Sequence, residues 1–203
     1  MRQAKKVILL AGPTASGKSK LAIKLAQHLN GEIINADSMQ IYKEISILTS
    51  KPKFKDIKNI KHHLYGFNSV KKGFSTGCWL KLVVKKIEEQ WKNKKIPIIV
   101  GGTGLYFKAL IDGLVKIPDI PNKKRSQIRK LHKKIGQKKF YTQLIKLDHL
   151  AKKSVLPSDT QRSMRAYEVK KFTGESLFKF LKKTKPNFNK SVFIKLFINI
   201  PRE

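Results

Sequence analysis

The chain has 203 residues, of which 40% are hydrophobic, and this is enough to bury the core of one large domain or two small ones. Its 45 lysine and arginine residues outnumber 13 acidic residues, and the net charge of +32 favours a polyanionic partner or an acidic membrane surface. The single cysteine excludes an internal disulfide and suits a reducing cytosol, and no apolar run approaches the roughly 18 residues that cross a bilayer.

The N-terminal part of the chain alternates between apolar strands and amphipathic helices. Val7–Ala11 is a continuous apolar run, which is typical of a parallel strand covered on both faces. Apolar residues at helical spacing between Leu21 and Leu29 predict a helix, and a second strand is predicted to end at Asp37. Strand, loop, helix and strand in this order open a doubly wound α/β domain.

The same pattern continues after a loop-like stretch over residues 51–72. Apolar residues recur at helical spacing over residues 79–91, and Ile96–Val100 has the composition of another buried strand. A short helix then ends at Gly113. We therefore assign residues 1–113 to an α/β core with a parallel sheet, like that of P-loop NTPases.

A phosphate-binding loop lies between the first strand and the first helix. The segment GPTASGKS matches the pattern G-x-x-x-x-G-K-S in full, and the alternative is a glycine-rich turn without a ligand. Its backbone N–H groups and the helix N-terminus favour phosphate, while Lys18 is expected to contact the terminal phosphates and the Ser19 hydroxyl to bind Mg²⁺. The predicted diphosphate or nucleotide site comprises Gly12, Pro13, Thr14, Ala15, Ser16, Gly17, Lys18 and Ser19.

One acidic residue, Asp37, stands at a predicted strand end. In a phosphate-transferring enzyme of this class an acid usually follows a later strand, but Ile96–Val100 runs into Gly-Gly-Thr-Gly. Ligands of an open parallel sheet bind at the carboxyl ends of its strands, so Asp37 is expected to face the phosphate loop. It could hold Mg²⁺ through water or accept a proton from a nucleophile. The alternative is an Asx turn or a helix cap.

A basic helical region follows the core. Two prolines mark the boundary, and residues 113–190 contain 22 basic and five acidic residues, a net charge of +17. Apolar residues at helical spacing predict two to four helices, so we assign residues 114–190 to a helical insertion domain. Ser191–Ile200 is predicted to be a strand that returns to the core, which would then include residues 191–203. Because 39 of the 45 basic residues in the whole chain are lysine, an excess without any partner remains an alternative.

Two smaller features carry expectations of their own. The adjacent residues His62 and His63 lack a third ligand for a metal site, and we expect one of them to be packed and the other exposed. The lone Cys78 is expected to be a small buried apolar residue rather than a nucleophile.

Several motifs together resemble the tRNA dimethylallyltransferase family, whose members modify a tRNA adenosine with an isopentenyl-type group. They occur in the order and with nearly the spacing of that family, over essentially the whole chain from Val7 to Glu203. The motifs are GPTASGKS, NADSMQIY, SKP, HHL, IPIIVGGTGLYFKAL and SDTQRSMRAYEV.

The resemblance implies transfer of a dimethylallyl group from dimethylallyl diphosphate to N6 of adenosine 37, flipped out of its stack, in tRNAs that read codons beginning with U. It implies Asp37 as general base, Thr103 as a second catalytic residue and Mg²⁺ as cofactor. The implied partners are dimethylallyl diphosphate and the tRNA anticodon stem-loop, for a cytoplasmic monomer that binds no membrane. Implied tRNA contacts are Asp37, Ser38, Met39, Gln40, Thr103, Arg125, Gln161, Arg162, Ser163, Met164 and Arg165.

Other functions remain open at this point. The family resembled continues beyond the Pro-Arg-Glu at residues 201–203, so we expect the C-terminal part of its fold to be missing. A P-loop kinase for a small molecule or nucleotide is one alternative, which the lack of an acid after Ile96–Val100 disfavours. A non-catalytic tRNA-binding remnant is the other, and the basic charge is compatible with it.

Overall fold

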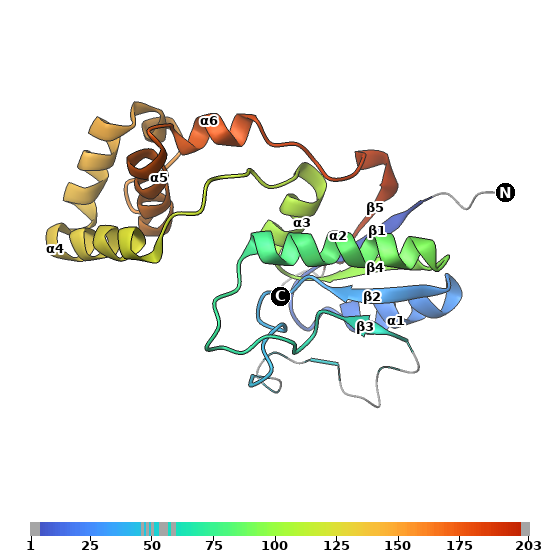
Figure 1. The fold of residues 1–203 in the computed structure, drawn as a ribbon. Helices are drawn as coiled ribbons and strands as arrows, with labels where there is room; N and C mark the ends of the chain where they lie inside the picture. The colour runs from blue at the N-terminus through green and yellow to red at the C-terminus, as the bar shows by residue number, and fades with distance from the viewer. Residues whose placement is uncertain are drawn as a thin grey trace. The chain divides into compact units, whose positions relative to one another are not determined.

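The computed structural model describes residues 5–45, 47, 49, 51–52, 57 and 60–199, which are shown in Figure 1. The chain forms two compact units, one of residues 1–113 together with 186–203 and the other of residues 114–185. None of the helices in this described part has the length and apolarity that crossing a bilayer requires.

A parallel sheet of five strands is the centre of the first unit. Its strand order is β3-β2-β4-β1-β5, and each pair of neighbours runs parallel. The predicted α/β class with a parallel sheet is therefore confirmed. The strands are β1 (Val7–Ala11), β2 (Gly31–Asn35), β3 (His62–His63), β4 (Ile96–Gly101) and β5 (Phe193–Phe197).

The helices of the first unit are α1 (Lys18–His28), α2 (Thr76–Lys92) and α3 (Gly104–Asp112). They cover both faces of the sheet, with α1 on one face and α2 and α3 on the other (Figure 1). Because alternate residues of a strand point to opposite faces, Ile8 and Leu10 of β1 share a buried cluster with α1, while Leu9 belongs to the cluster with α2 and α3. Burial on both faces explains the continuous apolar runs in the sequence.

The strand register brings three loops together at the carboxyl end of the sheet. Ala11 at the end of β1 pairs with Gly101 at the end of β4, and Asn35 at the end of β2 pairs with Val100. The carboxyl ends of β1, β2 and β4 are therefore level. As a result, the loops that follow these strands meet at the carboxyl end of the sheet, where parallel sheets bind their ligands.

Strand boundaries differ from the sequence prediction in β2, β5 and, by one residue at Gly101, β4. The second strand ends at Asn35 rather than Asp37, because Asn35 begins a hydrogen-bonded turn. The two-residue strand β3 was missed, since it lies in the stretch expected to be loop-like and is too short to show a pattern. The predicted return strand is real but shorter, and Ile200 to Glu203 lie outside the described residues.

Strand β5 lies at one edge of the sheet and pairs only with β1 among the described strands. Phe193 is buried, whereas Ile194, Leu196 and Phe197 are exposed. The strand thus leaves one backbone edge and three apolar side chains uncovered in the described part of the chain.

The second unit is helical, with α4 (Asn122–Leu147), α5 (Thr160–Thr173) and α6 (Leu177–Lys182) and a 3₁₀ turn over His149–Lys153. Gly136 interrupts α4 with φ 75° and ψ 165°, so this element consists of two helical segments. One of its buried apolar clusters joins α4, the 3₁₀ turn, the residues that follow this turn, and α5. The cluster consists of Leu144, Ala151, Val155 and Ala166.

Residues 186–190, which the sequence analysis assigned to the insertion, contact the first unit. The ring of Phe188 lies 5.2 Å from the ring of Trp91 in α2 and 6.3 Å from that of Phe193 in β5. These ring contacts anchor the chain where it re-enters the sheet.

Gly101 is expected to tolerate no side chain. A Cβ at this position would lie 2.2 Å from the carbonyl carbon and oxygen of Ala36, so Gly101→Ala must displace the backbone on which Asp37 sits. We expect the free energy of unfolding to fall by about 3 kcal/mol, measured by urea denaturation. Gly73→Ala is the control, because no described atom lies within 4 Å of a Cβ there. Equal losses in the two variants would contradict the prediction.

Candidate active site

The phosphate loop of residues 12–17 is an open turn between β1 and α1. Its first glycine is buried, and a Cβ on Gly12 would lie 2.9 Å from the carbonyl oxygen of Ile198. Ala15 and Gly17 have positive φ values of 62° and 78°. Gly17 is the N-cap of α1 and supplies no side-chain hydrogen bond, so the N–H groups of the first helical turn have no side-chain cap. This is the backbone arrangement that binds phosphate at a helix N-terminus.

Lys18 folds back over this loop. Its Nζ donates to the carbonyl oxygen of Pro13 and lies 3.3 Å from Oγ of Ser16. Burial lowers the pKa of Lys18, and the nearby carboxylate of Asp37 partly opposes that shift. The cation of the loop and the acid after β2 therefore share one electrostatic environment. Ser19, the predicted Mg²⁺ ligand, is exposed in the first turn of α1.

Asp37 lies near the loop, and both approach Gly102. The Cβ position of Gly102 is 3.8 Å from the carbonyl oxygen of Gly12 and 3.9 Å from Oδ2 of Asp37. Oδ1 accepts a hydrogen bond of 2.9 Å from the N–H of Met39, so the Asx turn considered as an alternative is present. No described residue donates to Oδ2. One oxygen therefore fixes the turn while the other is available for a ligand.

Thr103 connects the loop after β4 to the loop after β2. Its Oγ1 accepts from the N–H of Ser38 at 2.9 Å and donates to Oγ of Ser38 at 3.3 Å, while its own N–H donates to the carbonyl oxygen of Ala36 at 3.1 Å. Thr103 is the N-cap of α3 without capping it through its side chain. The hydroxyl is thus committed to holding the segment that includes Asp37.

The aromatic residues near this edge are not competing bases. Burial is the main cause that raises the pKa of Tyr106 to about 12, and Tyr42 and the Asp37 carboxylate add to the shift. Burial also raises the pKa of Tyr65, again with a contribution from Asp37. Both phenols stay neutral near pH 7, so neither can take up a proton as a phenolate.

The two other predicted contacts after Ser38 differ in accessibility. The Met39 side chain is 52% exposed. The Gln40 amide donates from Nε2 to the carbonyl oxygen of Thr49 at 2.8 Å, and is thereby part of the local fold. Met39 is therefore the more accessible of the two to a ligand.

The remaining predicted contacts belong to the second unit. Gln161 and Arg162 are exposed at the start of α5, where Asp159 caps the helix by accepting from the N–H of Arg162 at 2.9 Å. Asp159 also lies 3.5 Å from Nε of Arg162, whose side chain is 73% exposed. The other arginine of this segment, Arg165, lies 3.5 Å from Oε2 of Glu168. The pair of Arg162 with Asp159 is mostly exposed and contributes at most about 1 kcal/mol, so Arg162 could exchange its partner for a phosphate. Glu168 is buried, so the partner of Arg165 is less easily replaced.

Ser163 is placed differently from what a direct tRNA contact requires, whereas the contacts of Arg125 and Met164 stay predictions. Ser163 is fully buried, and its Oγ accepts a hydrogen bond of 3.2 Å from Nε2 of Gln137. Arg125 is half-buried on α4, and its Nε finds no hydrogen-bond partner among the described residues. Met164 is also half-buried. The exposed residues of this segment of α5 are therefore Gln161 and Arg162, and Arg165 is half-buried beside them.

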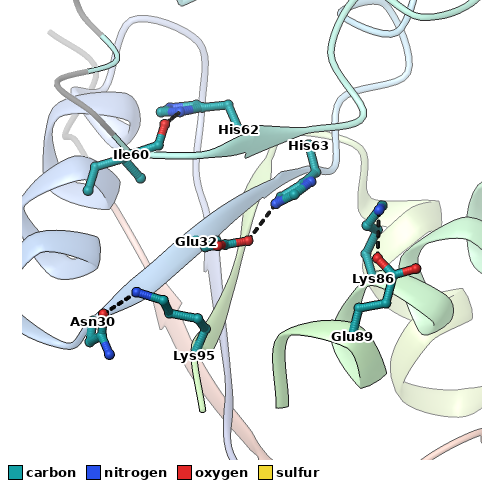
Figure 2. Close-up of polar contacts among 8 residues, drawn as sticks. All are labelled: Asn30, Glu32, Ile60, His62, His63, Lys86, Glu89 and Lys95. Atoms are coloured by element: carbon teal, nitrogen blue, oxygen red, sulfur yellow. Dashed lines mark hydrogen bonds and ion pairs between the residues drawn. The ribbon is translucent and has the colours of Figure 1, made fainter. Parts of the chain in front are cut away.

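The histidine pair lies at the β3 edge of the sheet. Figure 2 shows His63 turned toward Glu32 of β2, with 2.7 Å between Nε2 and Oε2, and His62 turned toward Ile60, whose carbonyl oxygen is 2.8 Å from Nδ1. Both rings are partly buried, so the expectation of one packed and one exposed histidine was wrong. Across the described residues, no three His, Cys, Asp or Glu side chains gather as a metal site would require.

Cys78 is exposed, and the expectation that it is buried was wrong. It lies in the first turn of α2, where Oγ of Ser75 donates to Sγ at 3.3 Å. The buried face of α2 begins with Trp79 and Leu80 and continues with Val83. Cys78 precedes this face and points away from the core.

A family model described as IPP transferase matches residues 40–203 of this chain. The chain belongs to the IPP transferase family. The phosphate loop and Asp37 precede the matched range, but they are included in full-length similarity to curated relatives.

Two of these curated relatives are named tRNA dimethylallyltransferase. The protein of Pelagibacter ubique is 58% identical over 203 residues, which is 100% of this chain and 65% of the relative. That of Rickettsia bellii is 49% identical over 178 residues, or 88% of this chain and 56% of the relative. The chain thus spans about two thirds or less of the length of these relatives.

The fold of this chain is also similar to that of solved structures. A eukaryotic dimethylallyltransferase, described as acting on tRNA, has a TM-score of 0.81 and 30% identity, covering 96% of this chain and 48% of its own. The tRNA isopentenylpyrophosphate transferase of Bacillus halodurans has a TM-score of 0.55 and 33% identity, covering 84% of this chain and 57% of its own.

The sequence analysis missed three residues that shape this site. Asn35 was included as part of a strand and of the motif NADSMQIY, Trp79 as a helical core residue, and Gly101 as part of a turn and of the motif IPIIVGGTGLYFKAL, but none of them was given a role in the site. The structure shows that all three contact the segment that includes Asp37, through a side-chain amide, an indole N–H and a close backbone approach. A signal was present in the Asn-x-Asp spacing, since both residue types form turns through their side chains two residues on.

His62 generates a prediction about pH. Burial lowers its pKa, although the hydrogen bond to Ile60 partly opposes this, so the unfolded chain binds a proton at His62 more readily than the folded chain does. Stability should therefore be lost as the pH falls below about 6.5, by at most about 1.4 kcal/mol per pH unit from this residue. Urea unfolding at pH 7.5 and 5.5 should show a smaller loss for His62→Asn than for the wild type.

His28→Asn, which removes an exposed imidazole from α1, is the control for this measurement. The prediction is wrong if His62→Asn loses as much stability between the two pH values as the wild type.

Proposed function

We propose that this chain transfers a dimethylallyl group from dimethylallyl diphosphate to a tRNA adenosine. The observation that supports this most directly is the position of Asp37 beside the phosphate loop, with Oδ2 facing Gly102 and without a described donor. The names of the relatives agree with the proposal, and the shared sheet edge gives it a physical basis.

The phosphate loop would hold the leaving group. When the C–O bond of an allylic diphosphate breaks, negative charge develops on the departing pyrophosphate. The uncapped N–H groups at the start of α1 and the cation of Lys18 are suited to stabilise that charge. The same loop would hold a nucleotide phosphate equally well, so it does not by itself specify the reaction.

Asp37 would serve as the general base. The exocyclic N6 of adenosine is a weak nucleophile, because its lone pair is delocalised into the ring. N6 attacks the allylic carbon, the C–N bond forms as pyrophosphate leaves, and the Asp37 carboxylate takes the N6 proton through Oδ2. Thr103 would act by holding the segment of Asp37 through Ser38 and Ala36.

Mg²⁺ is part of the proposal. The exposed Ser19 hydroxyl, in the first turn of α1 beside the phosphate loop, is a hard oxygen donor of the kind that this cation prefers, so it fits the ion. Ser19 would hold the ion together with diphosphate oxygens, and the ion would neutralise charge on the leaving group.

The second unit would provide the main tRNA contacts. Residues 113–190 carry a net charge of +17, which suits a phosphate backbone, and α5 offers the exposed Arg162 with the half-buried Arg165 beside it. We propose residues 114–190 as a tRNA-binding insertion that engages the anticodon stem-loop, with adenosine 37 of tRNAs reading U-initial codons as the target. A cytoplasmic monomer is the form proposed.

Asp37→Asn tests the reaction. The substitution keeps the size of the side chain and its turn-forming oxygen but removes the base, so label transfer from dimethylallyl diphosphate to unmodified tRNA should fall by about 10²- to 10⁴-fold. Binding of tRNA should be retained. Asp112→Asn is the control, because it removes a carboxylate of the same unit that pairs with Lys190.

Two outcomes would overturn the proposal. The first is a wild-type chain that transfers no label at saturating substrates, which would favour the non-catalytic tRNA-binding alternative. The second is release of ADP from ATP with phosphorylation of an acceptor, which would identify a kinase. Equal rates in Asp37→Asn and the wild type would leave the transfer but remove Asp37 as its base.

Arg162→Ala tests the tRNA contact of α5. If Arg162 binds a phosphate, the substitution should weaken tRNA binding and reduce the slope of log affinity against log salt concentration by about 1. The measurement is a filter-binding titration at several salt concentrations. Lys24→Ala, which removes an exposed cation from α1, is the control and should change neither quantity. An unchanged slope in Arg162→Ala would contradict the prediction.

A further inference from the structure

Asn35 is a fully buried polar residue at the end of β2, and all of its side-chain hydrogen-bonding atoms are engaged. Its Oδ1 accepts from the N–H of Asp37 at 2.8 Å. Its Nδ2 donates to the carbonyl oxygen of Asp37 at 2.9 Å and to that of Leu64 at 3.1 Å. The amide therefore binds the peptide groups on both sides of the Asp37 Cα atom.

This double contact fixes the direction of one particular side chain. The positions of the N–H and carbonyl groups of a residue fix its N, Cα and C atoms. These three atoms set the direction of the Cα–Cβ bond. With both groups bound to one rigid amide, the backbone of Asp37 cannot rotate without breaking a buried hydrogen bond. The Asp37 carboxylate is further fixed through Oδ1, which accepts from Met39. Two Asx turns thus follow one another, the first starting from Asn35 and the second from Asp37.

Asn35 is itself held on two sides. The indole Nε1 of Trp79 donates to its carbonyl oxygen at 2.8 Å, and Trp79 is fully buried in a stack with Tyr106 at 4.3 Å between ring centroids. The third bond of its amide reaches Leu64, which has a positive φ of 62° directly after β3. Asn35 therefore links the Asp37 segment to α2, α3 and the β3 edge of the sheet.

Both backbone groups of Ala36 and the N–H of Ser38 have other partners. The Ala36 N–H donates to Val100 at 2.7 Å, its carbonyl accepts from Thr103 at 3.1 Å, and the Ser38 N–H donates to Oγ1 of Thr103. Between Asn35 and Met39, Asp37 is the residue whose two backbone groups both depend on a single side chain. Loss of that side chain would release Asp37 while leaving the bonds of Ala36 and Ser38 in place.

We propose that Asn35 is a positioning residue, which sets the direction of the Asp37 carboxylate for proton removal. The inference rests on the proposed function in which Asp37 is the base. It assigns a role to a buried side chain that is too far inside the sheet to touch either substrate itself. A base that is displaced by about 1 Å loses on the order of 100-fold in rate even when its substrates still bind.

The test compares two variants of Asn35 with the wild type in the 203-residue chain. Asn35→Ala removes all three hydrogen bonds, whereas Asn35→Asp keeps the oxygen that accepts from the Asp37 N–H and loses the two donations. Asn68→Ala is the matched control, because the Asn68 amide also donates to two backbone carbonyls, those of Ser69 and Lys72. Two readouts are used: amide hydrogen exchange by NMR, and kcat and KM for dimethylallyl transfer to tRNA.

For Asn35→Ala we expect exchange of the Asp37 amide to accelerate about tenfold or more, while amides of β1 and β4 keep their protection. kcat should fall about 100-fold with KM for both substrates unchanged. Asn35→Asp should keep the Asp37 amide protected but still lower kcat, because a carboxylate oxygen at this place repels the carbonyl oxygens of Asp37 and Leu64 instead of binding them. The control should resemble the wild type in both readouts.

Two results would overturn the inference. One is an Asp37 amide that exchanges equally fast in Asn35→Ala and the wild type. The other is a uniform loss of protection across the sheet with KM raised as much as kcat is lowered, which would mean that Asn35 only stabilises the fold. The exchange measurement needs no substrate, so it decides whether the contact exists even if the wild-type chain transfers no label, a result that would count against the proposed function instead.

Discussion

The parallel pairing of β1, β4 and β2 is the constraint on which the site depends. The three strands run in one direction and end at the same level. The loop of residues 12–17, the turn at Asp37 and the start of α3 therefore meet at the carboxyl end of the sheet. No single segment holds both a cation and an acid in place. Their proximity is a property of the sheet, and it requires close backbone approach at Gly101 and Gly12, where a Cβ would clash with neighbouring carbonyl oxygens.

Much of the first unit could be predicted from the sequence, for one physical reason. Strands β1 and β4 are buried on both faces, so selection for apolar residues at every position leaves continuous runs such as Ile96–Val100. The two-residue strand β3 lacks such a signal, because its histidines are held by Glu32 and Ile60 rather than by a core. The end of β2 was misjudged because Asn35 reads as a polar strand residue, whereas its amide begins a turn.

The candidate site was predictable where a residue type is tied to its chemistry. It was less predictable where the position of a residue around a helix decides whether its side chain faces a ligand or the core. The phosphate loop and the acid after β2 follow from a spacing pattern and from strand ends. On α5, by contrast, the segment from Gln161 to Arg165 must turn through more than one helical turn, so its members cannot all face a ligand. Ser163 faces inward with Ala166, while Arg162 points to solvent. A motif gives the order of residues but not the side of the helix on which each one lies.

The exposed edge strand β5 has a consequence for handling the protein in solution. In the described part of the chain, one backbone edge of β5 has no partner strand, and Ile194, Leu196 and Phe197 lie uncovered on it. An apolar edge of this kind is a template for pairing with another chain, because N–H and C=O groups and side chains are offered together. Any pairing of chains through β5 would add to the signal of tRNA binding. The two can be separated by measuring binding at several concentrations of the chain, because only self-association changes with that concentration when tRNA is absent.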